Sequence, residues 1–583
     1  MYKLALFAQH DRIECMYIDV VPNRKSRPAF LLRESYREGD KVRKRTLANL
    51  SSLSEQQIDA IRTVLKGEPL YPAETLLDVI ASRPHGHVEA ASVAMSKLGV
   101  PGLLSRRPCR EQALVLAMIA ARILAPQTKL ATTRWWQTTT LADAFGVADA
   151  TEDELYEAMD WLLERQPAIE AKLAARHLEP GGLVLYDLSS SYFEGTTCPL
   201  AKRGYRRDSK KGKLQVNYGL LTDPEGRPVA ISVYEGNTAD ASTVLPQVQR
   251  VRDDFGVMDF VLVGDRGMLS HKAISELREH DGIGWVTALK SASIRALVEQ
   301  DALQMDLFDE RNLFELTHPD YPGERLIACR NPDLARLRAH KRESLLQATE
   351  RDLDKVRASV SAGRLRGQDA IGVRVGKVLN KYKVGKHIEL DIRDDAFRFV
   401  RNTSAIAAEA ALDGLYVVRT SLSAEKADSA QCVRYYKLLS QVERGFRSLK
   451  TIDLHVRPIH HRLEDRVRAH IFLCMLAHYV EWHLREAWRE LLFADEDQAA
   501  KQTRDPVAPA KRSAAADAKV SRRQHADGTP VHSFHTLLAE LSTIVRNTAR
   551  APGGEDAKST FEVITVANPL QQRALDLARQ IAV

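Results

Sequence analysis

The fold is decided by a short apolar run that ends in a carboxylate, Leu183-Val184-Leu185-Tyr186-Asp187. A second run of the same kind is Phe260-Val261-Leu262-Val263-Gly264, which Asp265 follows. Short apolar runs that are rich in β-branched residues and bounded by glycine predict buried β-strands. We therefore expect Asp187 and Asp265 at the C-terminal tips of two buried strands, where a carboxylate is held rigidly and still reaches solvent.

The segments between these two runs predict a mixed sheet. Strand patterns recur over residues 215–222 and 228–234, and the turn sequence Asp223-Pro224-Glu225-Gly226 joins them. A helix is expected over residues 242–255, before the run that ends at Asp265. Three meandering strands, a helix and a strand that bears a second aspartate are the order of an RNase H-like core. The predicted fold class is therefore α/β, with an RNase H-like mixed-sheet catalytic core.

Composition and periodicity divide the rest of the 583 residues into further segments. An inserted domain is expected within the core, because residues 336–386 hold fourteen Lys or Arg against five Asp or Glu. The predicted organisation is a small β-hairpin and helix unit that could contact DNA (1–70), a helical domain expected to bind DNA (75–178), the first part of the core (180–290), a charged insertion (291–410), the second part of the core with Glu443 (411–490), a flexible linker (495–530) and a helical C-terminal segment (531–583).

The N-terminal unit is predicted to contain a basic hairpin. Strand patterns over residues 30–36 and 41–47 flank the turn sequence Arg37-Glu38-Gly39-Asp40. Two interpretations of the second strand stay open: a charged edge that resists aggregation, and a hairpin that contacts DNA. Its cations are Lys41, Arg43, Lys44 and Arg45.

A third carboxylate, Glu443, lies on a basic segment that is predicted to be helical. Offsets of −7, −4, +4 and +7 from Glu443 fall on the same face of a helix, and they hold Tyr436, Leu439, Arg447 and Lys450. One interpretation of this mixed face is a solvated surface with an ordinary ion pair between Glu443 and Arg447. The other is that Glu443 binds metal while Arg447 and Lys450 grip phosphates beside it.

The three carboxylates together favour a site for divalent metal. Asp187 alone is compatible with a hydrogen bond to Ser189 or Ser190, and Asp265 alone with a turn cap. Adjacent strand tips, however, bring two like charges close together without an obvious cation unless metal binds. Mg²⁺ prefers oxygen ligands, and two such ions about 3.5–4 Å apart can clamp the attacking and leaving oxygens of a phosphoryl displacement. An Asp, Asp and Glu set beside clustered cations thus predicts metal-dependent chemistry on nucleic acid.

A second basic cluster follows the first strand. Seven cations fall within twelve residues and are opposed only by Asp208, while Tyr205 among them could stack on a base. We predict contact with the phosphate backbone of nucleic acid here. The cations are Lys202, Arg203, Arg206, Arg207, Lys210, Lys211 and Lys213.

The bulk composition agrees with a globular protein of the cytosol. Hydrophobic residues make up 44% of the chain, and the formal net charge is a mild +7. The six cysteines are scattered without a CxxC pair, which makes a disulfide framework improbable and a reducing compartment the natural setting. The N-terminus is not of the signal-peptide type, and the lack of an apolar stretch of about 20 residues predicts no membrane span.

Three blocks of the sequence resemble the DDE transposases of bacterial insertion sequences. The resemblance is greatest to the group with a Tyr-x2-Arg-x3-Glu-x6-Lys motif and a strand-rich insertion before the glutamate. Tyr436, Glu443 and Lys450 match that spacing, whereas Leu439 stands where the arginine is expected and Arg447 or Arg434 would compensate. The resemblance covers residues 180–485, and its blocks are Leu185 to Gly195, Tyr234 to Asp240 and Val263 to Met268.

This resemblance implies a transposase that binds the terminal inverted repeats of its element and cuts DNA strands by Mg²⁺-dependent hydrolysis. The freed 3′-hydroxyl then attacks target DNA. The three carboxylates are implied to hold two Mg²⁺ or Mn²⁺ ions in each active site, and Tyr436, Arg447 and Lys450 to position phosphates of the ends. The implied partners are double-stranded DNA, both transposon ends and target, and further copies of the chain in a homodimer or higher oligomer. The implied location is the bacterial cytoplasm, associated with the nucleoid.

Three rival functions are distinguished by particular residues. A haloacid-dehalogenase-type phosphatase would need a second aspartate two positions after Asp187, where Ser189 stands. A nuclease on the same core without strand transfer would share all three carboxylates. A DNA-binding repressor from a decayed element would have a broken carboxylate set, whereas all three carboxylates are present here.

Overall fold

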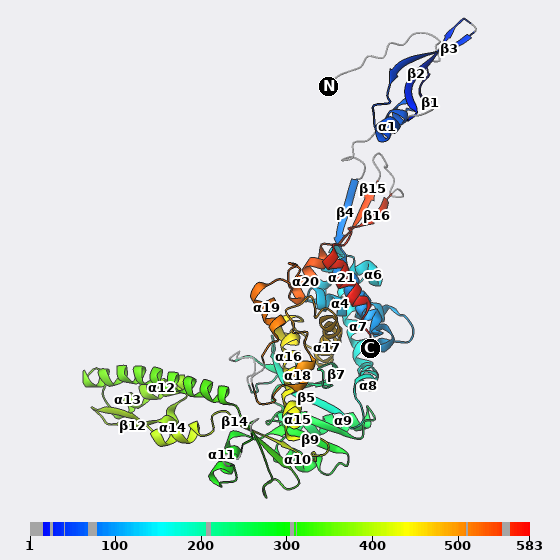
Figure 1. Ribbon diagram of the computed structural model, residues 1–583. Helices are drawn as coiled ribbons and strands as arrows, with labels where there is room; N and C mark the ends of the chain where they lie inside the picture. Colours follow the sequence, from blue (N-terminus) through cyan, green and yellow to red (C-terminus); the bar gives the residue numbers. More distant parts are fainter. Residues whose placement is uncertain are drawn as a thin grey trace. The chain divides into compact units, whose positions relative to one another are not determined.

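The computed structural model describes residues 15–23, 27–39, 41–67, 78–205, 212–303, 308–309, 312–508, 511–550 and 560–582. The chain forms two compact units. Residues 1–82 and 546–564 make up one, and residues 83–545 and 565–583 make up the other. The element labels used below are those of Figure 1.

The first unit holds two small sheets. One has the order β1-β2-β3 and is followed by α1 (Glu55–Leu65), which begins with a capping box between Ser54 and Gln57. The predicted hairpin is present and longer than expected, with Gly39 in the left-handed conformation at its turn and Asp40 outside the described residues. The other sheet has the order β16-β15-β4. The strands are β1 (Cys15–Val21), β2 (Ala29–Glu38), β3 (Lys41–Asn49), β4 (Asp78–Pro84), β15 (Val545–Arg550) and β16 (Thr560–Ile564).

The second unit begins with a helical layer. Helices α4 and α7 lie in the predicted helical region, and the apolar faces of both pack on the later helix α17 (Glu464–Ala487). Among the described residues, no single helix is long and apolar enough to cross a membrane, although the bent pair of α4 and Lys129–Thr138 passes that test of length and composition. The elements are α2 (Gly86–Lys97), α3 (Val100–Leu104), α4 (Arg110–Leu124), α5 (Lys129–Trp135), η2 (Trp136–Thr138), α6 (Leu141–Phe145), α7 (Glu152–Glu164) and α8 (Gln166–His177).

An eight-stranded mixed sheet forms the centre of the second unit, in the order β10-β11-β14-β9-β8-β5-β6-β7. Strands β5, β8 and β9 are parallel and all other neighbours are antiparallel. The portion β7-β6-β5-β8-β9 has the predicted RNase H-like order, and this prediction is confirmed. Its elements are β5 (Leu183–Tyr192), β6 (Gln215–Thr222), β7 (Pro228–Glu235), η3 (Asp240–Thr243), α9 (Val244–Asp253), β8 (Phe260–Gly264), α10 (His271–Leu277) and β9 (Ile283–Ala288).

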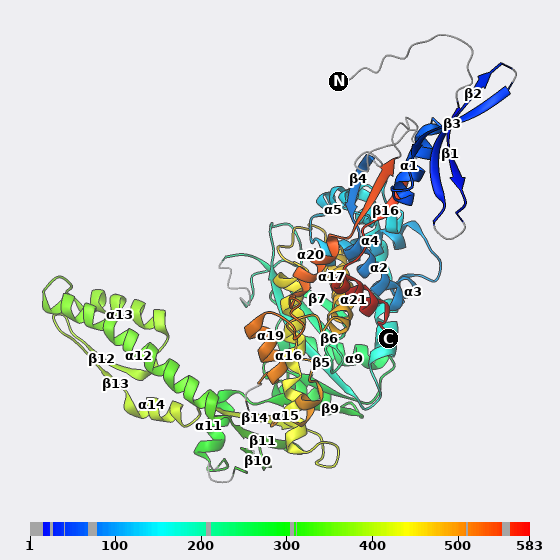
Figure 2. The ribbon, with the colours of Figure 1, turned by 45° about the horizontal axis from the view of Figure 1, so that its top comes forward.

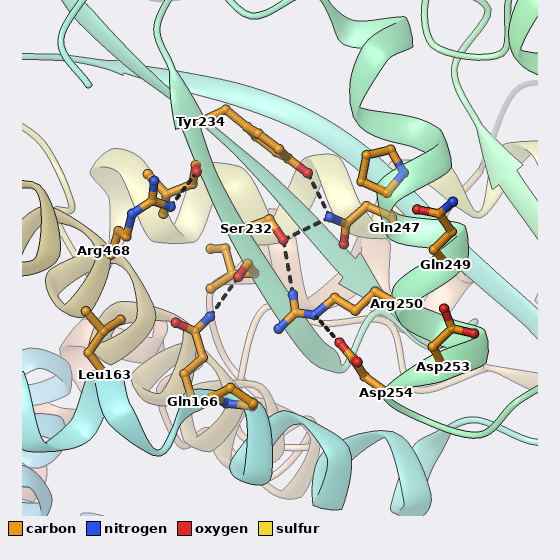
Figure 3. Close-up of a pocket in the computed structure, with 14 residues that line it drawn as sticks. Leu163, Gln166, Ser232, Tyr234, Gln247, Gln249, Arg250, Asp253, Asp254 and Arg468 are labelled. Carbon is orange, nitrogen blue, oxygen red and sulfur yellow. Dashed lines mark hydrogen bonds and ion pairs between the residues drawn. The ribbon is translucent and has the colours of Figure 1, made fainter. Parts of the chain in front are cut away.

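Side chains cover the outer edge of β7, so this edge is not available for pairing with another strand. Gln166 donates to the carbonyl of Ile231, and Arg468 donates to the carbonyl of Val233 at 2.8 Å (Figure 3). The amide of Ile231 donates to the Glu170 carboxylate. A cavity of about 570 Å³ lies beside this edge. Arg250, which lines this cavity, is bonded to Glu170 and Ser232. These polar groups therefore help to fix β7 against the neighbouring helices.

The charged insertion is divided between two structures. Its first strands extend the central sheet, as β10 (Leu313–Leu316) and β11 (Arg325–Arg330) beside β14 (Leu415–Thr420). The rest forms a module with its own apolar core, which includes Leu346, Leu353 and Ile371 (Figures 1 and 2). Helix α11 (Ser291–Glu299) packs with β11 and β14 instead. The elements of the module are α12 (Pro332–Ser361), α13 (Gln368–Tyr382), η4 (Gly385–His387), β12 (Ile388–Ile392), β13 (Phe397–Arg401) and α14 (Thr403–Ala410).

The C-terminal part differs from two predictions. Residues 495–530, predicted to be a flexible linker, contain two helices and pack on the protein: Val507 is buried, and the Lys519 ammonium donates to the Glu490 carbonyl at 2.9 Å. An Ala-rich polar composition suits a capped surface helix as well as a linker. Residues 531–583, predicted to be helical, also supply strands β15 and β16. The helices are α15 (Ser429–Lys437), α16 (Leu439–Arg447), the π-helical turn η5 (Ser448–Ile452), α17 (Glu464–Ala487), α18 (Ala499–Thr503), α19 (Ala514–Arg522), α20 (Phe534–Ser542) and α21 (Pro569–Arg579).

Candidate active site

The strand register places Asp187 and Asp265 at neighbouring positions of the sheet. The parallel pairing of β5 with β8 ends at Tyr186 and Gly264, and the two aspartates are the next residues on their chains. Asp187 was predicted to lie at the tip of its strand. This prediction is wrong, because β5 continues to Tyr192 along its antiparallel partner β6. Only the parallel pairing ends there, so both carboxylates lie where β5 and β8 diverge.

Asp265 is held by a turn and by a tyrosine. The amide of Gly267 donates to Asp265 Oδ2 at 3.4 Å, which makes the aspartate a turn cap as one interpretation proposed. The hydroxyl of Tyr436 donates to Asp265 Oδ1 at 3.3 Å, across 171 residues of sequence. Helix α15 is thereby joined to the tip of β8.

Helix α16 lies across β5 and β6 (Figure 2) and carries the third carboxylate. Phe446 packs edge-on against Tyr218 of β6, with ring centroids 5.8 Å apart. Gly445 allows the close approach, because a Cβ there would lie 3.4 Å from Leu220 of β6. Glu443 and Arg447 are exposed, and no ion pair joins them, contrary to the solvated-pair interpretation.

Burial and nearby carboxylates raise the pKa of Tyr436 well above its ordinary value. Burial contributes most, followed by the negative charge of Asp265, and the charge of Glu443 acts in the same direction. The phenol therefore stays protonated near neutral pH and remains a hydrogen-bond donor. This electrostatic coupling puts Asp265 and Glu443 in the surroundings of one hydroxyl.

The predicted single helical face is interrupted. An irregularity at Leu438 separates α15 from α16, and the π-helical turn η5 follows α16 directly. Leu439, which stands at the arginine position of the motif, is buried and belongs to the core. Lys450 lies on the wider π turn, so its direction differs from that of an α-helical residue at the same spacing.

A further carboxylate, Asp240, lies beside Asp265. A Cβ on Gly267 would lie 3.6 Å from Asp265 Oδ2 and 3.9 Å from Asp240 Oδ2, so the two carboxylates flank the same point. Asp240 is the first residue of η3, whose N-cap is Ala239. The signal that could have found Asp240 is its place at the end of the block that begins at Tyr234.

The basic cluster after β5 is only partly described. Arg203 is exposed, as is Tyr205, and Lys213 pairs with Glu194 at 2.6 Å. Lys202 is half-buried, and the remaining predicted phosphate contacts lie outside the described residues; they are Arg206, Arg207, Lys210 and Lys211.

The carboxylates suit a hard divalent cation in their chemistry, since all offer oxygen. Within the described ranges, no three Asp, Glu, His or Cys side chains are grouped closely enough to hold a metal ion. The arrangement therefore has the right donors around Tyr436 without a closed coordination shell.

Comparison with known proteins gives two family matches. Residues 184–480 match the model of the transposase DDE domain, and residues 18–72 match that of the N-terminal domain of IS1634 family transposases. No curated protein matches the chain. Among solved structures, the chain is similar to that of a piggyBac transposase synaptic complex with hairpin DNA, determined by cryo-EM. The identity is 8%, the TM-score is 0.34, and the match covers 78% of this chain and 76% of that one.

Proposed function

Because the chain belongs to the DDE transposase family of bacterial insertion sequences, we propose that it cuts DNA at the ends of its element and joins them to target DNA. The observation that carries this proposal is the Tyr436 hydroxyl on Asp265, which links the tip of β8 to the helices that carry Glu443. Parallel register brings Asp187 to the same place. These two observations support the proposal that the three carboxylates, which come from distant parts of the chain, act in one site.

In this proposal Asp187, Asp265 and Glu443 hold divalent ions, Mg²⁺ or Mn²⁺, two in each site. When bound, such ions stabilise the attacking and leaving oxygens of phosphoryl transfer. The residues of the chain orient the carboxylates: the Gly267 amide and the Tyr436 hydroxyl fix Asp265 from two sides. The packing of α16 on β5 and β6 fixes the backbone of Glu443.

We propose that cations around the site grip the DNA backbone. Arg447 is exposed and makes no hydrogen bond or ion pair with any described residue, so it is available for a phosphate. Tyr436 and Lys450 would lie along the same path, and the basic residues after β5 would add contacts: Arg203, Arg206, Arg207, Lys210 and Lys211. The partners are double-stranded DNA at the element's ends and at the target, and a homodimer or higher oligomer would pair two ends.

The basic hairpin of the first unit is proposed as a second DNA contact. Its strand β3 is exposed along its whole length. Arg43 and Arg45 are paired with Glu38 and Glu34, whereas Lys44 lies over the ring of Tyr17. These pairs hold the cations on the strand, and their exposed ends can still approach phosphates.

The test uses the full-length protein, DNA that carries the inverted repeats flanking its gene, and Mg²⁺. We expect Asp187→Asn, Asp265→Asn and Glu443→Gln each to abolish strand cleavage while end binding stays within about threefold of wild type. The control is Asp254→Asn, which removes a carboxylate from the end of α9 without touching the site. Full cleavage by any of the three variants would overturn the assignment. Cleavage without joining to target DNA would favour the nuclease, and binding without cleavage by the wild type would favour the repressor.

A further inference from the structure

A buried network of charged side chains lies directly beneath the helix that carries Glu443. Its centre is Glu481 of α17, whose side chain is fully buried. Ser448 Oγ donates to Glu481 Oε2 at 2.5 Å, His478 Nδ1 lies 3.1 Å from the same oxygen, and Arg485 Nε donates to Oε1 at 2.6 Å. A buried carboxylate is costly unless it is paired and hydrogen-bonded, and all three contacts serve that purpose here.

The network holds the π-helical turn at both of its ends. Ser448 is the first residue of η5, and Asp453 immediately follows its last. Arg485 bridges from Glu481 to Asp453 Oδ1, to which its Nη2 donates at 2.6 Å. His535 of α20 reaches the same Asp453 oxygen at 3.1 Å. These contacts from α17 and α20 therefore fix the length of η5 and the position of Lys450.

The network also touches α16 two residues after Glu443. His478 lies against Gly445, because a Cβ there would be only 3.1 Å from His478 Nε2. The opposite nitrogen of the same ring bonds Glu481. Any change in the position of Glu481 therefore reaches α16 through His478 as well as through Ser448.

We propose that Glu481 is a positioning residue of the active site, which fixes the rotation and height of α16 so that Glu443 meets the two strand aspartates. This inference rests on the proposed function. Glu481 itself touches neither DNA nor the reacting atoms; it acts through Ser448 and His478. A residue that orients a ligating carboxylate from behind typically changes metal affinity or activity about tenfold to a hundredfold when it is altered.

The test compares Glu481→Gln with a matched control. The glutamine keeps the shape of the side chain but is neutral, so it cannot form an ion pair with Arg485. The control is Glu324→Gln, because Glu324 is equally buried and is clamped by Arg419 and Arg278, far along the chain from α16 and η5. Both substitutions remove one buried charge from an arginine pair, so both should lower the melting temperature measured without metal.

Only Glu481→Gln should change the response to metal. We expect it to raise the Mn²⁺ concentration needed for half-maximal cleavage about tenfold and to shrink the Mn²⁺-induced rise in melting temperature, which reports binding without catalysis. Glu324→Gln should keep both at wild-type values. A Glu481→Gln protein with a wild-type metal response, or a Glu324→Gln protein with an equal defect, would overturn the proposal.

Two further measurements keep the outcomes distinct. If Glu481→Gln does not fold, Ser448→Ala removes one bond of the network with less disturbance, and a wild-type metal response in that variant would also overturn the proposal. If the wild type itself shows neither a Mn²⁺-induced rise nor cleavage, the proposed function fails, and the positioning role fails with it. If the wild type and Glu443→Gln behave as the proposed function requires, a normal Glu481→Gln protein refutes the positioning role alone.

Discussion

At the scale of single residues, the Tyr436 hydroxyl is the contact that organises the site. Among the residues that the structure describes, this hydroxyl joins Asp265 to the helical segment that carries Glu443. Its half-buried position and its two acidic neighbours keep it protonated. A phenylalanine would leave the packing of the ring in place and remove only this donor.

Tyr436→Phe should therefore weaken the site more than the fold. A typical intramolecular hydrogen bond contributes about 1 kcal/mol to stability, and urea denaturation should show a loss of that size or less. Cleavage of end DNA should fall clearly further, because Asp265 loses one of its two fixed partners. The control is Tyr435→Phe, whose hydroxyl contacts Gln431 of the same helix at 2.8 Å. Equal cleavage by the two variants would contradict the role given to Tyr436.

At the scale of elements, the seat of α16 on the sheet depends on the glycine at position 445. Gly445→Ala should destabilise the protein by about 1–3 kcal/mol, the usual cost of overpacking, because its Cβ would meet His478 and Leu220. The control is Gly376→Ala in α13, where a Cβ meets nothing within 4 Å. There the substitution should stabilise by up to about 1 kcal/mol through helix propensity. Thermal unfolding of both variants measures the contrast, and a neutral Gly445→Ala would contradict the tight seat.

The ion pair between Asp453 and His535 predicts a pH dependence of stability. Burial opposes ionisation of Asp453, yet the bonds from His535 and Arg485 prevail and lower its pKa to about 2. The bond to Asp453 raises the pKa of His535 above its ordinary value, although burial acts against this. The aspartate contribution is present above its ordinary pKa and is lost as pH falls towards 2. The histidine contribution is present below its ordinary pKa and is lost as pH rises through the raised value.

The difference in melting temperature between wild type and His535→Gln should accordingly be largest near pH 5 and smaller at pH 8. It should be modest at every pH, because half of the His535 side chain is exposed and solvent screens the pair. His532→Gln serves as a control from the same segment. A difference that grows with pH would contradict the assignment of the proton to His535.

The sequence predicts the elements of this site better than their junctions. Periodicity identifies β5, β8 and the order of the core, because a buried strand needs an uninterrupted apolar run. The spacing of Tyr436, Glu443 and Lys450, which resembles a transposase motif, selects Glu443 as a candidate. Periodicity misses the continuation of β5 beyond Asp187, because the polar residues Ser189 to Ser191 do not have an apolar strand pattern, although β6 pairs with them. It misses η5 as well, because a π turn is set by tertiary bonds from Glu481 and Asp453 rather than by local propensity.

At the scale of the whole molecule, separate apolar cores imply separate stabilities. The module of α12, α13, β12 and β13 has its own core, distinct from the core beneath the central sheet. Regions with their own cores open in their own cooperative units. The insertion should therefore respond to a cavity in its core without loosening the active site.

Leu353→Ala tests this separation, because Leu353 is fully buried within the insertion core. Removing a buried leucine side chain costs about 2–5 kcal/mol, and hydrogen–deuterium exchange should rise in α12 and α13 while α16 and α17 keep wild-type protection. The matched variant is Leu473→Ala, equally buried in α17, which should raise exchange in α17 and α4 and leave α13 unchanged. If Leu353→Ala raised exchange in α17 as strongly as in α12, the two cores would behave as one cooperative unit. The insertion would then be coupled to the site that holds Glu443, and its apolar core could not be treated as an independent source of stability.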